Sequence, residues 1–296
     1  MFVSCLLCLV AADPQLADRP TDSPQAATPQ TIVLLGGTMI EREQEHGDWE
    51  AAIRTLDPTT PYRLRNLAWS GDTVWAESRG RFRPPAEAYP DLIKTVAAIK
   101  PDRLILGYGR AEALSANRSV DDFVAQYRTL LSDLPDGPRT LLGIPLLGLD
   151  RLPDDVRASQ KARMERFEQA IAELAAETGS RFVPLSEPDL ARPELTDGGL
   201  QWNAAGYAAS APAVATLTVA NARSPLTLSV DQAAELRSLI QRKNRLVFHR
   251  FRPQNTTYLL LFRKHEQGQN AAEIPRFDPA ITNADLVVDR LLQSAR

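Results

Sequence analysis

Two kinds of side chain in this sequence could do chemistry, and they lie in or beside short segments rich in glycine. Thr38 carries a hydroxyl just after an apolar run, and a hydroxyl attacks an ester only when an adjacent base accepts its proton. Two aromatic and two charged residues belong to comparable segments further along: Trp69, Trp202, Arg110 and Glu112. Rings with a few charges suit a pocket for a sugar or an acyl group. The alternative is that both tryptophans are core residues.

Five short apolar runs, separated by helical patterns, must position these segments. The predicted strands are Thr31–Leu35, Arg63–Asn66, Arg103–Tyr108, Thr140–Leu147 and Arg181–Leu185. This alternation predicts an α/β fold, a three-layer α/β/α sandwich around a five-stranded parallel sheet. Ligands of such sheets bind at the carboxyl ends of the strands, so the residues just past each strand are the candidates for a site.

Four of the glycine-rich segments, in order along the chain, carry a family resemblance. They are Gly36–Glu41, Asn66–Thr73, Gly107–Ala113 and Leu195–Tyr207. Over roughly residues 31–220 they resemble the conserved blocks of the SGNH (GDSL) hydrolases, and especially a bacterial branch with a basic C-terminal arm. The resemblance implies a flavodoxin-like three-layer fold and esterase or acylhydrolase chemistry, often on acylated carbohydrates.

The catalytic positions of that family map onto five residues of this chain. The resemblance places Thr38 at the position of the nucleophilic serine and Gly71 at that of an oxyanion-hole glycine. Ala111 stands where the family has an asparagine of the oxyanion hole. Gly198 and Gln201 stand where the family has the aspartate and histidine of its acid–base machinery. At Ala111, Gly198 and Gln201 the residue type therefore cannot fill the role that the resemblance implies.

These departures predict a degenerate member with little or no hydrolysis that retains a pocket for an acyl or carbohydrate ligand. Gln201 cannot accept a proton at any useful pH, and Ala111 offers an oxyanion no donor. The hydroxyl of Thr38 also fits a capping box, because Glu41 follows at the T-x-x-E spacing. The histidines that could replace the missing base are His46, His249 and His265.

Two other functions remain open on the sequence. One is an active esterase on acylated carbohydrate that uses Thr38 with a non-standard base. The other is a structural or interaction module of the cell envelope.

The chain from residue 224 to 296 differs in character and is expected to be an arm packed on the hydrolase-type domain of residues 31–223. Val230–Arg245 has an amphipathic helical pattern, and Arg242–His265 holds seven Lys or Arg residues and no Asp or Glu. Large rings are interleaved with this charge: Phe248, Phe251, Tyr258 and Phe262. Because rings favour burial and unpaired charges resist it, we expect the rings to pack on the domain and Arg250 and Arg252 to face acidic groups.

Charge and composition exclude several classes of protein. The 296-residue chain has a net charge of −3, so the molecule as a whole is not a nucleic-acid binder on electrostatic grounds. Two cysteines and three histidines supply little material for a metal cluster. We therefore expect neither a metal nor a cofactor, and the expected partner is a small acyl or carbohydrate ligand.

The N-terminal segment has the pattern of an export signal. Phe2–Ala12 is apolar and too short to span a bilayer, and Ala11 and Ala12 are small residues suited to a cleavage site. The positive residue usual ahead of such a segment is missing, and an apolar helix that packs is the alternative. We expect residues 1–30 to be a signal peptide and linker, the mature chain to have no transmembrane segment, and the protein to be secreted or periplasmic.

Export by cleavage predicts that mature protein from the native host lacks Phe2–Ala12. Because Cys5 and Cys8 are the two cysteines of the chain, the mature protein should carry no free thiol. Mass spectrometry of the intact protein checks both expectations. A measured mass that includes Met1 or Cys5 would contradict them.

Overall fold

The computed structural model describes residues 28–80, 83–219 and 225–296. The expected signal peptide, with Cys5 and Cys8, lies outside the described residues. Within those three ranges no helix combines the length and apolar character needed to cross a bilayer.

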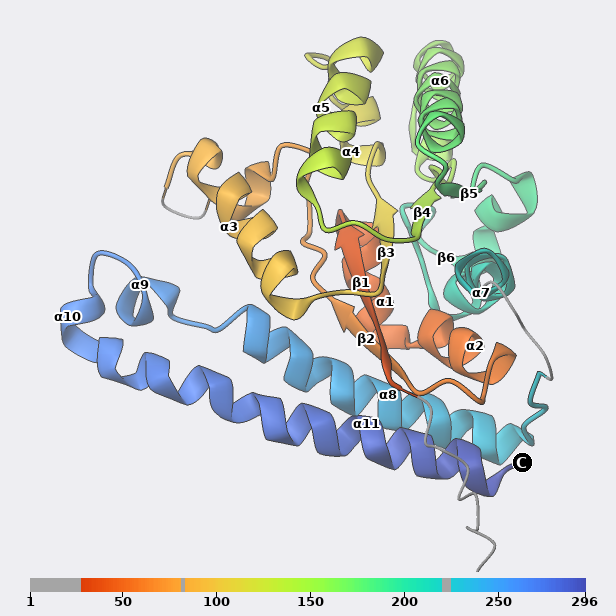
Figure 1. The fold of residues 1–296 in the computed structure, drawn as a ribbon. Helices are drawn as coiled ribbons and strands as arrows, with labels where there is room; N and C mark the ends of the chain where they lie inside the picture. Colours follow the sequence, from red (N-terminus) through yellow and green to blue (C-terminus); the bar gives the residue numbers. More distant parts are fainter. Residues whose placement is uncertain (1–27, 81–82, 220–224) are drawn as a thin grey trace, which may run out of the picture.

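A five-stranded parallel sheet forms the centre of the molecule (Figure 1). Its strands are β1 (Gln30–Gly36), β2 (Tyr62–Asn66), β3 (Arg103–Gly107), β4 (Arg139–Leu142) and β5 (Arg181–Val183), in the order β2-β1-β3-β4-β5. The predicted fold class is confirmed. The fourth strand is shorter than expected and stops before Pro145, whose nitrogen cannot donate to a neighbouring strand. β2 lies on one side of β1, and β3, β4 and β5 follow on the other side. The strand order therefore reverses at β1, and ligands of such sheets bind at this point.

Helices cover both faces of the sheet because both faces of its strands are apolar. Alternate residues of β1 join different cores: Val33 and Leu35 pack with one group of helices, and Ile32 and Leu34 with the other. The first group is α3 (Pro85–Ile99), α5 (Val120–Asp133) and α6 (Asp154–Glu177), and the second is α1 (Thr38–His46), α2 (Asp48–Leu56) and α7 (Ala204–Thr218). Shorter elements complete this part: α4 (Arg110–Leu114), the hairpin of β6 (Thr196–Asp197) and β7 (Gln201–Trp202), and the 3-10 turns η1 (Glu77–Arg79), η2 (Leu149–Arg151), η3 (Pro188–Ala191) and η4 (Pro193–Leu195).

Two long helices of the C-terminal region lie side by side along the edge of the sheet formed by β2 (Figure 1). They are α8 (Val230–Phe251) and α11 (Phe277–Ser294), and the chain between them forms α9 (Thr256–Leu259), α10 (Lys264–Gln267) and η5 (Gly268–Arg276). We call residues 230–294 the C-terminal hairpin. Its apolar contacts centre on Ile240 of α8 and Val288 of α11, with Ala51 of α2 packed against them. An open strand edge invites pairing with other chains, and this hairpin covers it.

The rings of the C-terminal hairpin differ in burial, and its arginines differ in their ion-pair partners. Phe251 packs against the core of the sheet, whereas Phe262 is 68 % exposed, so the expectation that every ring docks is wrong for Phe262. Arg252 pairs with Glu41 of α1. Arg250 instead pairs with Asp278 within the hairpin itself. Arg250 lies in the last turn of α8, whereas Arg252 is the C-cap residue just beyond the helix and reaches Glu41 of α1, which explains the difference.

Buried charges join the hairpin to the rest of the fold. On α2, Arg54 pairs with Glu50 of its own helix at 2.9 Å and with Asp285 of α11 at 3.1 Å. Lys243 of α8 pairs with Glu50 and also donates to the backbone oxygen of Leu64 in β2 at 3.2 Å. Both Lys243 and Asp285 are 0 % exposed.

The edge strand supplies further cations to the same cluster. Arg65 of β2 pairs with Asp285 at 2.7 Å, and Arg63 of the same strand pairs with Asp289 at 2.7 Å. Burial alone would raise the pKa of Asp285, but Lys243, Arg65 and Arg54 together outweigh it and hold that pKa below its usual value. The carboxylate is therefore ionised at neutral pH. We call these seven side chains the buried ion cluster: Glu50, Arg54, Arg63, Arg65, Lys243, Asp285 and Asp289.

We predict that Asp285→Asn costs about 3–5 kcal/mol of folding free energy, because it leaves buried guanidinium groups without their anion. Asp278→Asn is a matched control on the same helix, since its ion pair with Arg250 lies at the surface. That control should cost about 0–1 kcal/mol. Urea denaturation of both variants measures the two costs, and equal costs would show that the buried cluster does not hold the fold.

A second buried carboxyl makes stability depend on pH. Glu43 accepts the backbone N–H of Trp49 at 2.9 Å. Burial, followed by the charge of Glu50, raises the pKa of Glu43 from 4.5 to about 8. A group with a raised pKa contributes stability that is complete below the unfolded value and is lost as pH rises through the folded value. Stability should therefore fall between pH 4.5 and pH 8.

We predict that Glu43→Gln flattens this fall, because glutamine keeps an acceptor for the Trp49 N–H but does not ionise. Melting temperatures of wild type and variant at pH 5, 6.5 and 8 measure the slope. Glu45→Gln, at an exposed position of the same helix, is the control and should leave the slope unchanged. The same slope in Glu43→Gln as in wild type would contradict the prediction.

Candidate functional site

A pocket of about 220 Å³ opens where β1, β2, β3 and β4 end. Glycines let the strand ends approach closely: a Cβ on Gly36 would lie 2.4 Å from the backbone oxygen of Gly107, which directly faces it in register. The pocket is lined by the segments that follow the strands: Gly37, Thr38, Met39, Gly71, Asp72, Gly107, Tyr108, Gly109, Arg110, Ala111, Glu112, Leu114, Gly143 and Pro145. We call it the Thr38 pocket.

Thr38 is the first residue of α1 and does not cap it. The N-cap is Gly37, whose backbone oxygen accepts the N–H groups of Ile40 and Glu41. The expected capping box is therefore wrong, because β1 runs to Gly36 and the helix begins one residue earlier than the spacing suggested. Because it does not cap the helix, Thr38 Oγ1 is available to accept the backbone N–H of Gly71 at 2.9 Å.

Two further positions named from the family pattern also reach this pocket. Gly71 has a φ of +71°, in the left-handed region that favours glycine, and this turn aims its N–H at Thr38. Ala111 lies in the first turn of α4 and lines the pocket with a methyl group. The fold thus brings Thr38, Gly71 and Ala111 together in one pocket, and Ala111 offers that pocket no side-chain donor.

Glu112 lines the pocket from α4 but is fully engaged by the backbone. Its two carboxylate oxygens accept the N–H groups of Val74 and Gly109, each at 2.9 Å. Burial raises the pKa of Glu112 to about 7, and the two backbone hydrogen bonds oppose that rise. The side chain ties the segment after β3 to the segment after β2, so it positions the pocket wall.

Gly198 and Gln201 do not line the Thr38 pocket; they belong to the β6–β7 hairpin beside it. The β6–β7 hairpin contacts the Thr38 pocket through Arg110, whose guanidinium donates to the backbone oxygen of Leu200 at 3.0 Å. Gly198 has a φ of +58° in the turn, and its backbone oxygen accepts from Arg151. Gly198 is thus a turn residue whose backbone is held by Arg151.

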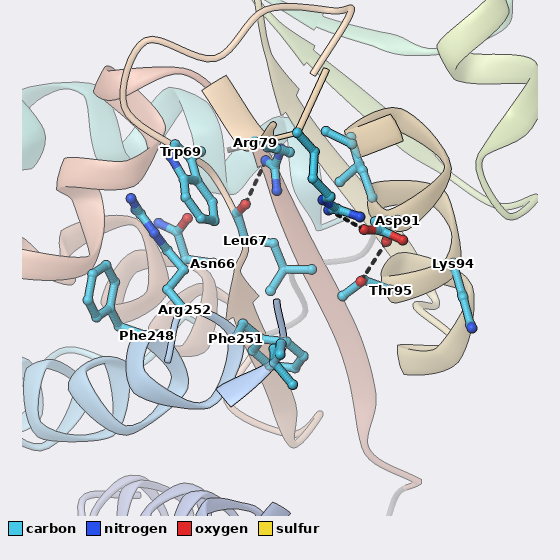
Figure 2. A pocket seen from close by; sticks show the side chains of 14 residues that line it. Asn66, Leu67, Trp69, Arg79, Asp91, Lys94, Thr95, Phe248, Phe251 and Arg252 are labelled. Carbon is cyan, nitrogen blue, oxygen red and sulfur yellow. Dashed lines mark hydrogen bonds and ion pairs between the residues drawn. The ribbon is translucent and has the colours of Figure 1, made fainter. Parts of the chain in front are cut away.

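The two tryptophans named as binding residues lie away from the Thr38 pocket. Trp202 is 1 % exposed, packs edge-on against Tyr207, and donates its indole N–H to the backbone oxygen of Leu190. It is a core residue, as the alternative reading held. Trp69 lines a different pocket, where the guanidinium of Arg252 covers its ring at 3.8 Å (Figure 2).

None of the three histidines lines the Thr38 pocket. His46 lies in the last turn of α1, at the opposite end from Thr38, and stacks on Tyr207 at 4.4 Å. His249 lies in α8, and His265 is exposed in α10. In the described ranges no set of three His, Cys, Asp or Glu side chains is grouped to hold a metal ion.

Two residues of the pocket region were missed by reasoning from the sequence. Asp72 is 1 % exposed, lines the Thr38 pocket and pairs with Arg79 at 2.6 Å. Burial raises the pKa of Asp72, and Arg79 opposes that rise. The position of Asp72 directly after Gly71 could have indicated a residue of the site. No sequence pattern indicated that Arg79, seven residues later, is its partner.

Comparison with solved structures finds the same fold in hydrolases. A protein from Parabacteroides merdae that carries the name GDSL-like lipase matches with a TM-score of 0.52 and 16 % identity, over 66 % of this chain and 97 % of that one. A catalytic mutant of Axe2, an acetylxylan esterase from Geobacillus stearothermophilus, matches with a TM-score of 0.50 and 16 % identity, over 65 % of this chain and 95 % of that one. A search of curated proteins found no match.

The sequence itself matches a family model. The model describes the GDSL-like Lipase/Acylhydrolase family and matches residues 36–209, which is more than half of the chain. The matched range includes every strand-end segment of the Thr38 pocket and the hairpin with Gly198 and Gln201. The resemblance seen in the sequence is confirmed, and the chain belongs to the GDSL-like lipase/acylhydrolase family.

Proposed function

We propose that this chain binds a small acyl or carbohydrate ligand in the Thr38 pocket and hydrolyses esters slowly or not at all. The observation that carries the proposal is the surroundings of the Thr38 hydroxyl. In the described part of the chain its hydrogen bond comes from the Gly71 N–H, and no side chain accepts its proton. A hydroxyl without a base is a poor nucleophile.

The carboxylates near the pocket are committed to other partners. Glu41, one turn along α1 from Thr38, accepts the hydroxyl of Ser70 and pairs with Arg252. Glu112 accepts two backbone N–H groups. Using either one as a base would require breaking these contacts, so neither replaces the histidine that the family places at the position of Gln201.

Stabilisation of a developing oxyanion is weakened as well. The Gly71 N–H, which would be one donor, already faces the oxygen of Thr38. Ala111 adds no donor, and loss of one such donor costs about 2.7–4 kcal/mol of transition-state stabilisation in a well-studied enzyme. The absent base and the incomplete oxyanion hole together support binding without efficient turnover.

The size and lining of the pocket suit an acyl group carried on a larger molecule. Its volume of about 220 Å³ is below the range of about 300–1,000 Å³ usual for drug-sized ligands. Met39 and Leu114 give it apolar walls. Acetylated xylan, the substrate class named for Axe2, is a suitable first probe.

Location and domain organisation form part of the proposal. Residues 1–30 act as signal peptide and linker, residues 31–223 form the hydrolase-type domain, and residues 224–296 form the attached arm. The exported protein would meet acylated carbohydrates outside the cytoplasm.

An active esterase is the second candidate function. It is favoured by the 2.9 Å contact that keeps Thr38 Oγ1 and the Gly71 N–H together in the pocket. In that case a group outside the family pattern, or a water molecule, accepts the proton.

We predict that hydrolysis of 4-nitrophenyl acetate by the wild-type protein stays near background and that Thr38→Ala leaves the rate unchanged. Thr38→Ala should still melt cooperatively, because the hydroxyl makes one exposed contact. A fall of about 100-fold or more in the rate of Thr38→Ala would show that the hydroxyl is a nucleophile and would support the esterase.

Restoring the family residues should create activity only when they are combined. The variant carries Thr38→Ser, Ala111→Asn, Gly198→Asp and Gln201→His, together with Arg151→Ala. The last change is needed because a Cβ at position 198 would lie 2.8 Å from the guanidinium of Arg151, which would pair with the new carboxylate. We expect kcat/KM to rise about 100-fold over wild type, while Thr38→Ser alone has little effect, since these groups act as a unit. No rise in a folded combined variant would contradict the proposed reason for inactivity.

A further inference from the structure

We propose that a second pocket, between the C-terminal hairpin and the hydrolase-type domain, binds a small organic carboxylate. Its volume is about 250 Å³. Trp69 lines this pocket, whereas Gly71 and Asp72 line the Thr38 pocket, so one short segment borders both. Figure 2 shows the side chains of α3, of the end of β2 and of the end of α8 around it. We call it the interface pocket.

Four cationic side chains line the interface pocket: Arg79, Arg83, Lys94 and Arg252. The three arginines each have a carboxylate partner. Arg79 pairs with Asp72 at 2.6 Å, and Arg83 pairs with Asp91 at 2.5 Å.

Arg252 and Lys94 determine the net charge that is left in the interface pocket. Arg252 pairs with Glu41 of α1. Lys94, on α3, forms no ion pair with any residue that the structure describes. The four cations therefore exceed by one the three carboxylates that pair with them. A singly charged anion balances this excess, whereas a doubly charged phosphate would leave a surplus of negative charge.

The rest of the lining is apolar and aromatic. The guanidinium of Arg252 lies between the rings of Trp69, at 3.8 Å, and Phe248, at 4.9 Å. Phe251 and Leu67 lie at the centre of the view in Figure 2, between Arg252 and Asp91. Such surfaces bind the hydrocarbon part of a ligand.

Burial makes Arg252 a receptive cation. It lowers the pKa of Arg252 to about 10, so the guanidinium is still charged at neutral pH although it is poorly hydrated. An anion placed nearby replaces part of the lost hydration. A lining that combines cations with rings and aliphatic side chains thus matches a carboxylate attached to a small apolar or aromatic group.

Isothermal titration calorimetry of the full chain at pH 7 with benzoate tests the proposal. Benzamide, the neutral analogue, and inorganic phosphate are the comparison probes. We expect benzoate to bind about ten-fold more tightly than either, because benzamide lacks the charge and phosphate lacks the apolar part. Raising NaCl from about 50 mM to about 300 mM should weaken the binding of benzoate, since salt screens the exposed charge.

Lys94→Gln locates the ligand, and it is safe for folding because Lys94 is exposed. It should weaken benzoate binding about five-fold or more, since it removes the unpaired cation. Lys161→Gln, at an exposed position of α6 outside the pocket, should have no effect. Arg110→Gln, in the Thr38 pocket, should also leave the affinity unchanged and thereby separates this proposal from the proposed function.

Several results would overturn the assignment. They are the absence of any heat of binding with benzoate, equal affinities for benzoate and benzamide, and equal affinities for benzoate and phosphate. An unchanged affinity in Lys94→Gln would also overturn it, as would weaker binding in Arg110→Gln, which would place the ligand in the Thr38 pocket.

Discussion

The buried ion cluster is the interaction on which the rest of the molecule depends. It places four cations and three anions from α2, β2, α8 and α11 in contact. Charges without water around them are stable only when each has a partner in good geometry, so a shifted hairpin would leave buried charges unpaired. The apolar contacts around Ile240 and Val288 add area to this junction but little directional preference.

That placement reaches the candidate sites through the end of α8. Arg252 follows the last residue of the helix, contacts the ring of Trp69 and pairs with Glu41. Trp69 is two residues before Gly71, whose N–H meets Thr38. The C-terminal hairpin therefore lines the interface pocket directly and contacts Trp69, in the same short segment as Gly71 of the Thr38 pocket.

The Thr38 pocket lies at the strand ends of a fold that this chain shares with GDSL-like hydrolases. Its shape rests on backbone: the close approach of Gly36 and Gly107, the left-handed turn at Gly71, and the two N–H groups held by Glu112. Under the proposed function, the chemistry depends on single side chains: the amide of Gln201 supplies no base and the methyl group of Ala111 supplies no oxyanion donor, while the backbone frame of the pocket stays intact.

The sequence by itself determined the strands, the parallel sheet, the family and the edge of the sheet where the pocket lies. Those features follow from local patterns: branched apolar runs, glycines after them, and four segments in order. Tertiary structure decided the rest, because the deciding contacts join distant residues. Whether Thr38 caps its helix depended on where β1 ends, and whether Trp69 or Trp202 faces a pocket depended on which helices pack over each ring. Lys243 meets Glu50 across 193 positions of sequence, and a pairing over that distance is set by the packing of α8 on α2, which no local pattern encodes.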